Sequence, residues 1–185
     1  MNKNIALLAA VSVFALANSA DALEFRPYVG AQYNTTHVNV NVKESNANVD
    51  MHSYSVFVGT EYNKYFGTEV FYQNSNKWHK VIDGEINKAV FEAYGLDAYG
   101  YLPLGCDQVI APFITAGIAN YDVDSQVAGE AKEKDNGLGY RLGGGIQYHI
   151  TDNVAVRALG RYVWADKLDD IDHFSEFSLG MKYVF

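Results

Sequence analysis

Two side chains near the C-terminal end of the chain could begin a nucleophilic site. His173 and Ser175 lie two positions apart in the stretch HFSEF. A histidine that takes the proton of a serine hydroxyl turns that serine into a nucleophile, and an acid that orients the imidazole completes the group. In an extended strand His173 and Ser175 point to one side, whereas Glu176 points to the other. The nearest acid is therefore turned away, and we expect a polar strand end rather than a catalytic centre.

Acidic residues form two candidate cation sites. Asp122, Asp124 and Glu133 have the first, third and twelfth spacing of a calcium-binding loop. Val127 stands at the sixth position, where that loop needs glycine, so we expect a solvated acidic loop. A second cluster contains Asp166, Asp169, Asp170 and Asp172. It could hold a divalent cation or remain a solvated surface. We predict no resident metal and no cofactor.

The elements that carry these residues are predicted to be strands. From Phe177 to Phe185 apolar residues alternate with small or polar ones, which is the two-residue period of a strand with two different faces. The same alternation recurs along the chain. It predicts eight strands at residues 26–33, 54–62, 66–73, 90–101, 110–121, 138–150, 153–164 and 174–185. The fold class is therefore all-β.

The first 22 residues are predicted to lie outside this fold. They contain Lys3, an apolar run over residues 5–17 and the small-residue ending Ala20-Asp21-Ala22. These features are typical of a secretory signal peptide with cleavage after Ala22. The alternative, a membrane-anchoring helix, needs about 20 apolar residues, and this run is shorter. We expect a single barrel domain over residues 23–185.

The connections between the predicted strands alternate in length. Long polar stretches occupy residues 36–50, 74–88, 122–137 and 165–173, and short ones occupy 63–64, 103–105 and 151–153. In an up-and-down antiparallel barrel all four long connections then lie at one end. The segment 36–49 itself alternates, so it is either an extended hairpin whose Val38, Val40 and Val42 offer an edge to partner strands or a mobile loop.

Alternation does not say which face points outward, because a soluble lipocalin-like barrel turns its apolar face inward. Three features favour the inverted arrangement of a transmembrane barrel. With the polar face inside, the lumen collects acids and bases in equal number, as buried charge requires. This predicted lumen charge network comprises Glu24, Arg26, Glu61, Glu69, Asp97, Arg141, Arg157, Arg161, Glu176 and Lys182. Glycines on the same face leave room for long side chains, and outward aromatics gather near both strand ends, as in the girdles of lipid-facing barrels.

The C-terminal strand carries the most specific pattern. SLGMKYVF, with Gly180, Tyr183 and the terminal Phe185, resembles the assembly signal of Gram-negative outer-membrane barrels. The whole chain after residue 22 is similar to the small eight-stranded OmpA/OmpX-like family of the opacity and surface-antigen type. The resemblance is to the barrel domain of that family only. Its x-P-Y-V-G-A-G pattern appears as RPYVGA at 26–31 and APFITA at 111–116, with Thr115 in place of the usual glycine.

The resemblance implies a non-enzymatic surface protein of the outer membrane that serves adhesion, host contact or envelope integrity. It implies periplasmic termini, extracellular long loops, contact with outer-membrane lipid and lipopolysaccharide, recognition of the C-terminal strand by the barrel assembly machinery, and a host or surface ligand on the loops. The net charge of −8 argues against nucleic acid. Two alternatives stay open. One is a lipid-modifying barrel, because the spacing of His173 and Ser175 resembles that of lipid A 3-O-deacylases, and the other is a narrow low-conductance pore.

Overall fold

The computed structural model describes the backbone of residues 25–42, 45–75, 78–82, 85–104, 109–126, 133–166 and 173–185. Side chains are described for residues 25–37, 51–75, 91–104, 109–122, 136–164 and 173–185. The predicted signal peptide, Glu24 and Cys106 lie outside these ranges, and cleavage after Ala22 stays a prediction.

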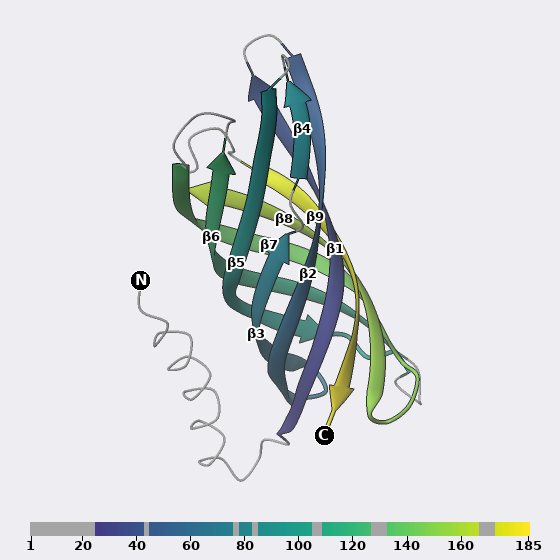
Figure 1. Cartoon of the computed structure of the whole chain (residues 1–185). Coiled ribbons are helices and arrows are strands. Elements are labelled where there is room, and N and C mark those ends of the chain that lie inside the picture. The colour runs from purple at the N-terminus through teal and green to yellow at the C-terminus, as the bar shows by residue number, and fades with distance from the viewer. Residues whose placement is uncertain are drawn as a thin grey trace.

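The described chain forms one antiparallel sheet that closes on itself (Figure 1). Its strands are β1 (Arg26–Val42), β2 (Ser45–Asn63), β3 (Phe66–Ser75), β4 (Trp78–Ile82), β5 (Glu85–Tyr101), β6 (Ile110–Gln126), β7 (Glu133–His149), β8 (Val154–Asp166) and β9 (His173–Val184). Both β3 and β4 pair with β5, so they occupy one place in the wall. The pairing of β3 with β5 closes the sheet. The prediction of an eight-stranded up-and-down barrel is confirmed.

The long connections are shorter than predicted, because most of their residues continue the strands. Only residues 43–44 separate β1 from β2, and the two strands stay paired from Val42 opposite Ser45 down to Arg26 opposite Glu61. The prediction of a polar loop over residues 36–50 is wrong, and the hairpin alternative describes the backbone. An antiparallel hairpin satisfies its own backbone hydrogen bonds, so it can continue beyond the barrel wall.

The first and last strands seal the barrel. β1 pairs with β9 from Tyr28 opposite Val184 to Val38 opposite Phe174. The amide of Phe185 adds one further bond, donated to the carbonyl of Pro27 over 2.9 Å. A wall immersed in hydrocarbon needs every backbone group paired, and this seam leaves the last residue paired as well.

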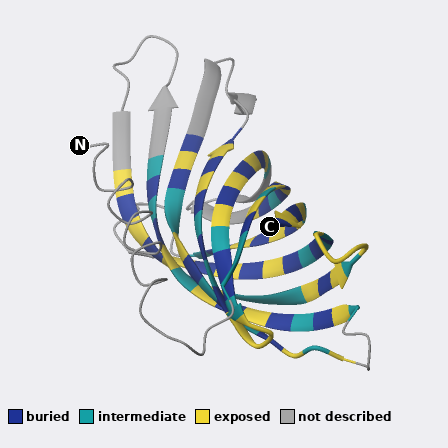
Figure 2. Cartoon of the chain, turned by 90° about the horizontal axis from the view of Figure 1, so that it is seen from below, coloured by how far each residue is buried: buried dark blue, intermediate teal, exposed yellow. Residues whose placement is uncertain are grey.

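Burial alternates along each strand, as Figure 2 shows in blue and yellow. On β9 the outward side chains are Phe177, Leu179, Met181, Tyr183 and Phe185, all exposed. The inward Glu176 and Lys182 are 4% and 1% exposed. Large apolar residues therefore face out and charged residues face in, which is the reverse of a soluble barrel.

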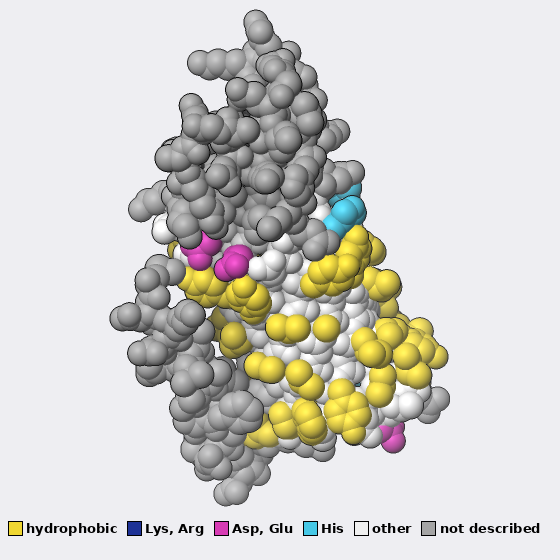
Figure 3. All heavy atoms as spheres, viewed as in Figure 1, with side chains coloured by type: hydrophobic (Ala, Val, Ile, Leu, Met, Phe, Trp, Pro, Cys, Tyr) yellow, Lys and Arg dark blue, Asp and Glu magenta, His cyan; other side chains and the backbone are white. Residues whose placement is uncertain are grey.

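Among the side chains that the structure describes, those on the outer face of the wall are almost all uncharged. Among strand residues with described side chains, the outward carboxylates are Glu92 and Asp122, which lie opposite each other near the hairpin end. On the face seen in Figure 3, the part that is not grey is mostly yellow and white, with acidic and histidine side chains at its margin. Such an uncharged band suits contact with lipid chains. No helix in the described part of the chain is long and apolar enough to span a membrane.

The interior is less polar than the alternation predicted. Phe57, Phe71, Tyr99, Phe113 and Phe174 are buried inside the barrel, within two apolar clusters. These rings fill the space between the charged groups. They also explain why the alternation in residues 90–121 is imperfect, since aromatic residues occur there on both faces.

Candidate functional site: the ion-pair network of the lumen

The centre of the lumen is occupied by an arginine held by a carboxylate on the opposite wall. Arg157 of β8 donates from Nη1 to Oε2 of Glu69 over 2.6 Å and from Nη2 to Oε1 over 2.9 Å. This two-bond geometry is the strongest form of an arginine–carboxylate pair. Nη2 also donates to the side-chain oxygen of Gln32 over 2.7 Å, and the guanidinium lies 3.9 Å above the ring of Phe57. Glu69 is 1% exposed, so the pair is shielded from bulk water.

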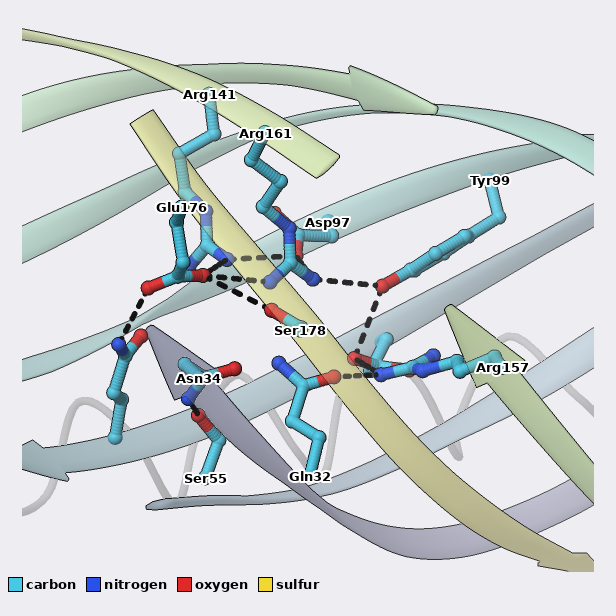
Figure 4. A network of polar contacts seen from close by, with 12 residues as sticks. Gln32, Asn34, Ser55, Asp97, Tyr99, Arg141, Arg157, Arg161, Glu176 and Ser178 are labelled. Carbon is cyan, nitrogen blue, oxygen red and sulfur yellow. Dashed lines mark hydrogen bonds and ion pairs between the residues drawn. The ribbon is translucent and has the colours of Figure 1, made fainter. Parts of the chain in front are cut away.

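A second cluster lies nearer the hairpin end, as Figure 4 shows. Arg161 donates to Oε1 of Glu176 over 3.0 Å and to Oδ2 of Asp97 over 3.1 Å. Arg157 and Arg161 are four residues apart on one strand, so they share a face but sit about 13 Å apart along it. The same strand thus supplies one cation to each cluster.

Arg141 of β7 completes the second cluster in a different way. Its Nη2 lies 3.5 Å from Asp97 and 3.8 Å from Glu176, and its guanidinium stacks 3.9 Å above the ring of Phe71. These are ion-pair distances rather than short hydrogen bonds. Glu176 is held more tightly by Gln73, whose amide donates to it over 2.6 Å.

A third group lies toward the short turns. The ammonium of Lys182 donates to Oε1 of Glu61 over 2.6 Å and lies 4.4 Å from the ring centre of Tyr28. Arg26 approaches the other oxygen of Glu61 at 3.8 Å, and its side chain is 42% exposed. The network therefore ends in a water-accessible pair at this mouth of the barrel.

Two tyrosines join the three groups into one network. The hydroxyl of Tyr99 accepts a hydrogen bond from Arg161 over 3.2 Å and donates to Glu69 over 3.2 Å. The hydroxyl of Tyr28, whose ring lies under Lys182, donates to Glu69 over 3.2 Å. Hydrogen bonds, ion pairs and the contact of Lys182 with the ring of Tyr28 thus connect the three groups along the lumen.

The arginine–carboxylate pairs also offset the repulsion between two carboxylates that the strand register brings together. Glu69 and Asp97 are directly opposite each other on β3 and β5, where two like charges repel. Arg157 neutralises the first and Arg161 the second. Gly117 lies beside Asp97 on the next strand, and a Cβ there would collide with Oδ1 of Asp97. Glycine at this position is therefore what lets Arg141 and Asp97 approach from either side.

The structure places nearly all of the predicted lumen residues inside the barrel. Those described are Arg26, Glu61, Glu69, Asp97, Arg141, Arg157, Arg161, Glu176 and Lys182, and Glu24 lies outside the described residues. The sequence interpretation missed Tyr99 and Gln73 as members of the network. Their parity could have found them, since Tyr99 shares the face of Asp97 and Gln73 shares the face of Glu69. The functional role of the network stays a proposal.

His173 and Ser175 lie on the outer face, as their parity predicted. The imidazole of His173 stacks on the ring of Tyr162 with centroids 5.4 Å apart, and Ser175 is exposed. Glu176 points inward to Arg161 and Gln73. The described contacts therefore assemble no Ser-His-acid group at this strand end.

The other predicted sites fall partly outside the described side chains. They include the calcium-like spacing that runs to Glu133, the aspartates at 166–172, and Val38, Val40 and Val42. No group of three or more His, Cys, Asp or Glu that could hold a metal occurs among the described residues. Gly180, Tyr183 and Phe185 lie on β9 and at its end, and their role in assembly stays a prediction.

Comparisons with known proteins agree with this architecture. The chain matches the family model of the outer membrane protein beta-barrel domain over residues 6–185. A search of curated proteins finds no match. Among solved structures it is similar to Neisserial surface protein A, with a TM-score of 0.71 and 18% identity over 86% of this chain and 97% of that one.

Two further structures share the fold. Ail, the attachment invasion locus protein of Yersinia pestis, has a TM-score of 0.64 and 15% identity, over 88% of this chain and 100% of that one. The N-terminal β-barrel domain of Pseudomonas aeruginosa OprF has a TM-score of 0.60 and 14% identity, again over 88% and 100%. At such identities the likeness concerns the fold alone. The family model covers almost the whole chain, and the protein belongs to the outer membrane protein beta-barrel family.

Proposed function

We propose that this barrel is a non-enzymatic surface protein whose long hairpins project from the outer membrane and bind a partner there. The observation that carries the proposal is strand length. β1, β5, β6 and β7 each contain 17 residues and β2 contains 19, whereas about 9–11 residues span a bilayer. The surplus extends toward one end only, where the hairpins stand above the barrel wall in Figure 1.

The lumen supports a contact role rather than transport. Arg157, Glu69 and the rings around them occupy its centre, and each buried charge there has an opposite charge within ion-pair distance. An ion that crossed would have to displace these pairs, and leaving one partner of a buried pair uncompensated is costly. We therefore propose that the network closes the barrel, and that the alternative of a low-conductance pore does not describe its resting state.

The chemistry of the partner follows from charge. Ail was crystallised with sucrose octasulfate, a heparin analogue, so one protein of this fold binds a polysulfated ligand. The present chain carries a net charge of −8, and its segment 165–172 contains four aspartates and one lysine. Like charges repel across an interface. We propose a basic or neutral protein surface as the partner, in place of a polysulfated one.

The register allows a clean test with shortened hairpins. Removing residues 38–42 together with 45–49 deletes matched rungs, because Val38 lies opposite Val49 and Val42 opposite Ser45. The turn residues 43–44 then follow His37 and precede Asp50, which are themselves opposite each other. Cells that display the wild type should be retained by beads coated with a basic protein. Shortening this hairpin and that of β6 and β7 should lower retention several-fold, since it removes contact surface but keeps the acidic segment 165–172.

A second variant tests the charge alone: Asp166, Asp169, Asp170 and Asp172 become asparagine, and all hairpins are kept. It should weaken retention and reduce its salt dependence. Equal retention by heparin-coated beads, or full retention after both hairpins are shortened, would contradict the proposal. The lipid-modifying alternative is tested separately by Ser175→Ala, for which we expect an unchanged lipid A profile.

A further inference from the structure

The outer face of the barrel wall contains a groove of about 490 Å³ over β7, β8 and β9. Its lining includes Leu142, Gly160, Tyr162, Ser175 and Phe177, with His37 of β1 at its edge. All of these positions have the outward parity of the lipid-facing band. The lining also includes Gly143, Arg161 and Glu176, which have the inward parity, so the groove shares part of the wall with the lumen network but opens on the other side of it.

The register explains why the wall is hollow here. Gly160 lies directly between Phe177 of β9 and Gly144 of β7, so two glycines are neighbours on the outer face. A Cβ at Gly160 would meet no atom within 4 Å. The floor is therefore bare backbone, whereas Phe177 and Leu142 stand beside it and are 55% and 53% exposed.

The two ends of the groove differ in polarity. Toward the hairpins, His37, Ser175 and Tyr162 lie side by side on β1, β9 and β8. Toward the short turns, the next outward residues are Leu179 and Ala158, which are also neighbours. The groove therefore has a polar end at the margin of the uncharged band and an apolar body within it.

We propose that this groove binds one acyl chain of a membrane lipid, from the leaflet beside the long hairpins, with the lipid's polar head near His37 and Ser175. The groove is continuous with the uncharged outer band of exposed apolar side chains, a surface that suits contact with acyl chains. No charged side chain projects outward among its described lining residues; Arg161 and Glu176 contribute to its floor but turn inward to each other. A flexible apolar chain can fill a depression that a rigid wall of side chains leaves open. Lipid offers no hydrophobic driving force for this step, so the site is favoured by the van der Waals contacts that the chain gains with Leu142, Gly160 and Phe177. This proposal does not depend on the surface contact proposed above.

The test uses a photoreactive lipid. The mature protein is reconstituted into phosphatidylcholine vesicles that contain a small share of phosphatidylcholine with a diazirine in the middle of one acyl chain. After irradiation, the labelled peptides are mapped by mass spectrometry. We expect labelling around Gly160 and Phe177 to exceed, several-fold, that around Leu96 and Ile118, which face lipid on β5 and β6.

Gly160→Leu should fill the groove and lower this labelling to the level of the rest of the wall. The matched control is Gly100→Leu on β5, which also adds a side chain to the outer face but meets only the side chain of Ile114, with its nearest atom at 3.4 Å. It should leave the labelling near Gly160 unchanged. Heat-modifiable migration on gels checks that both variants fold.

Three outcomes would overturn the proposal. Uniform labelling around the wild-type barrel would contradict the proposal, and no variant would be needed to show this. Labelling near Gly160 that persists in folded Gly160→Leu would show that the groove does not hold the lipid. A wild-type dimer under chemical cross-linking that becomes a monomer in Gly160→Leu would assign the groove to a second copy of this chain.

Discussion

At the scale of single residues, Arg157 lies at the centre of the lumen. Four side chains interact with its guanidinium group, through its charge, its hydrogen-bond donors or its flat face. It pairs with Glu69, donates to Gln32 and stacks near Phe57 and Tyr99. Removing one partner of a buried pair leaves an uncompensated charge, which typically costs about 3–5 kcal/mol. Arg157→Ala should lower the free energy of unfolding by about that amount, measured by urea titration of the protein in lipid vesicles.

The control for this prediction is Arg26→Ala. Arg26 faces the same carboxylate-lined lumen, but its side chain is 42% exposed and lies 3.8 Å from Glu61. A water-accessible pair of this kind contributes about 0–1 kcal/mol. The double variant Arg157→Met with Glu69→Leu should recover much of the loss, since it removes both charges. Equal effects of Arg157→Ala and Arg26→Ala would contradict the buried pairing.

The sequence predicts the side of each lumen residue but not its partner. Parity alone turns Arg157, Arg161 and Glu176 inward, and the structure places all three there. Partners across the lumen depend on the height of each strand in the closed barrel, and so on its stagger against its neighbours. That is why neither the pairing of Arg157 with Glu69 nor the position of Tyr99 between Glu69 and Arg161 could be predicted.

At the scale of elements, β9 decides whether the barrel closes. The main chain of Phe185 bonds to Pro27, whereas its ring is 70% exposed on the outer face. A polar side chain there keeps the backbone bond. Phe185→Ser should therefore leave refolding into detergent unchanged but lower, several-fold, the fraction of protein assembled in the outer membrane of cells, measured by heat-modifiable migration.

Met181→Ser is the matched control, because Met181 lies on the same face of β9 and is 57% exposed. It should assemble as the wild type does, since its side chain is not part of the terminal signal Gly180, Tyr183 and Phe185. If Phe185→Ser refolds poorly in detergent as well, the ring serves the stability of the barrel rather than recognition by the assembly machinery.

Strand ends are where sequence and structure differ most at this scale. Residues 36–50 contain four asparagines, which favour turns, so the sequence there resembles a loop. Pairing with the adjacent strand nevertheless holds β1 and β2 together up to residues 43–44. The residue preference of a strand depends on what packs around it, so amino-acid propensity alone did not predict this paired hairpin.

At the scale of the whole molecule, the fold is set by the inversion of burial. Exposed Ile114 and Leu179 and buried Glu69 and Lys182 would be unfavourable in a soluble protein. The exposed apolar residues become favourable when the outer face contacts lipid. The buried charged residues become favourable when each has an opposite charge beside it in the lumen. The sequence could predict this arrangement because acids and bases share one parity. The aromatic residues Phe57 and Tyr99 share that inward parity as well, and their filling of the lumen was not predicted because large apolar side chains were expected on the outer face.

The two ends of the barrel differ in the length of their connections, and this difference predicts the orientation of the barrel in the membrane. Outer-membrane barrels have short turns on the periplasmic side and longer connections outside, so the end with the β6–β7 hairpin should be extracellular. A protease site inserted within residues 127–132 should be cut in intact cells. The same site inserted at Asp152, in the turn between β7 and β8, should be cut only after the outer membrane is permeabilised, because the protease cannot cross it. Cleavage is read from fragment size on gels, and cutting at Asp152 in intact cells would show the opposite orientation.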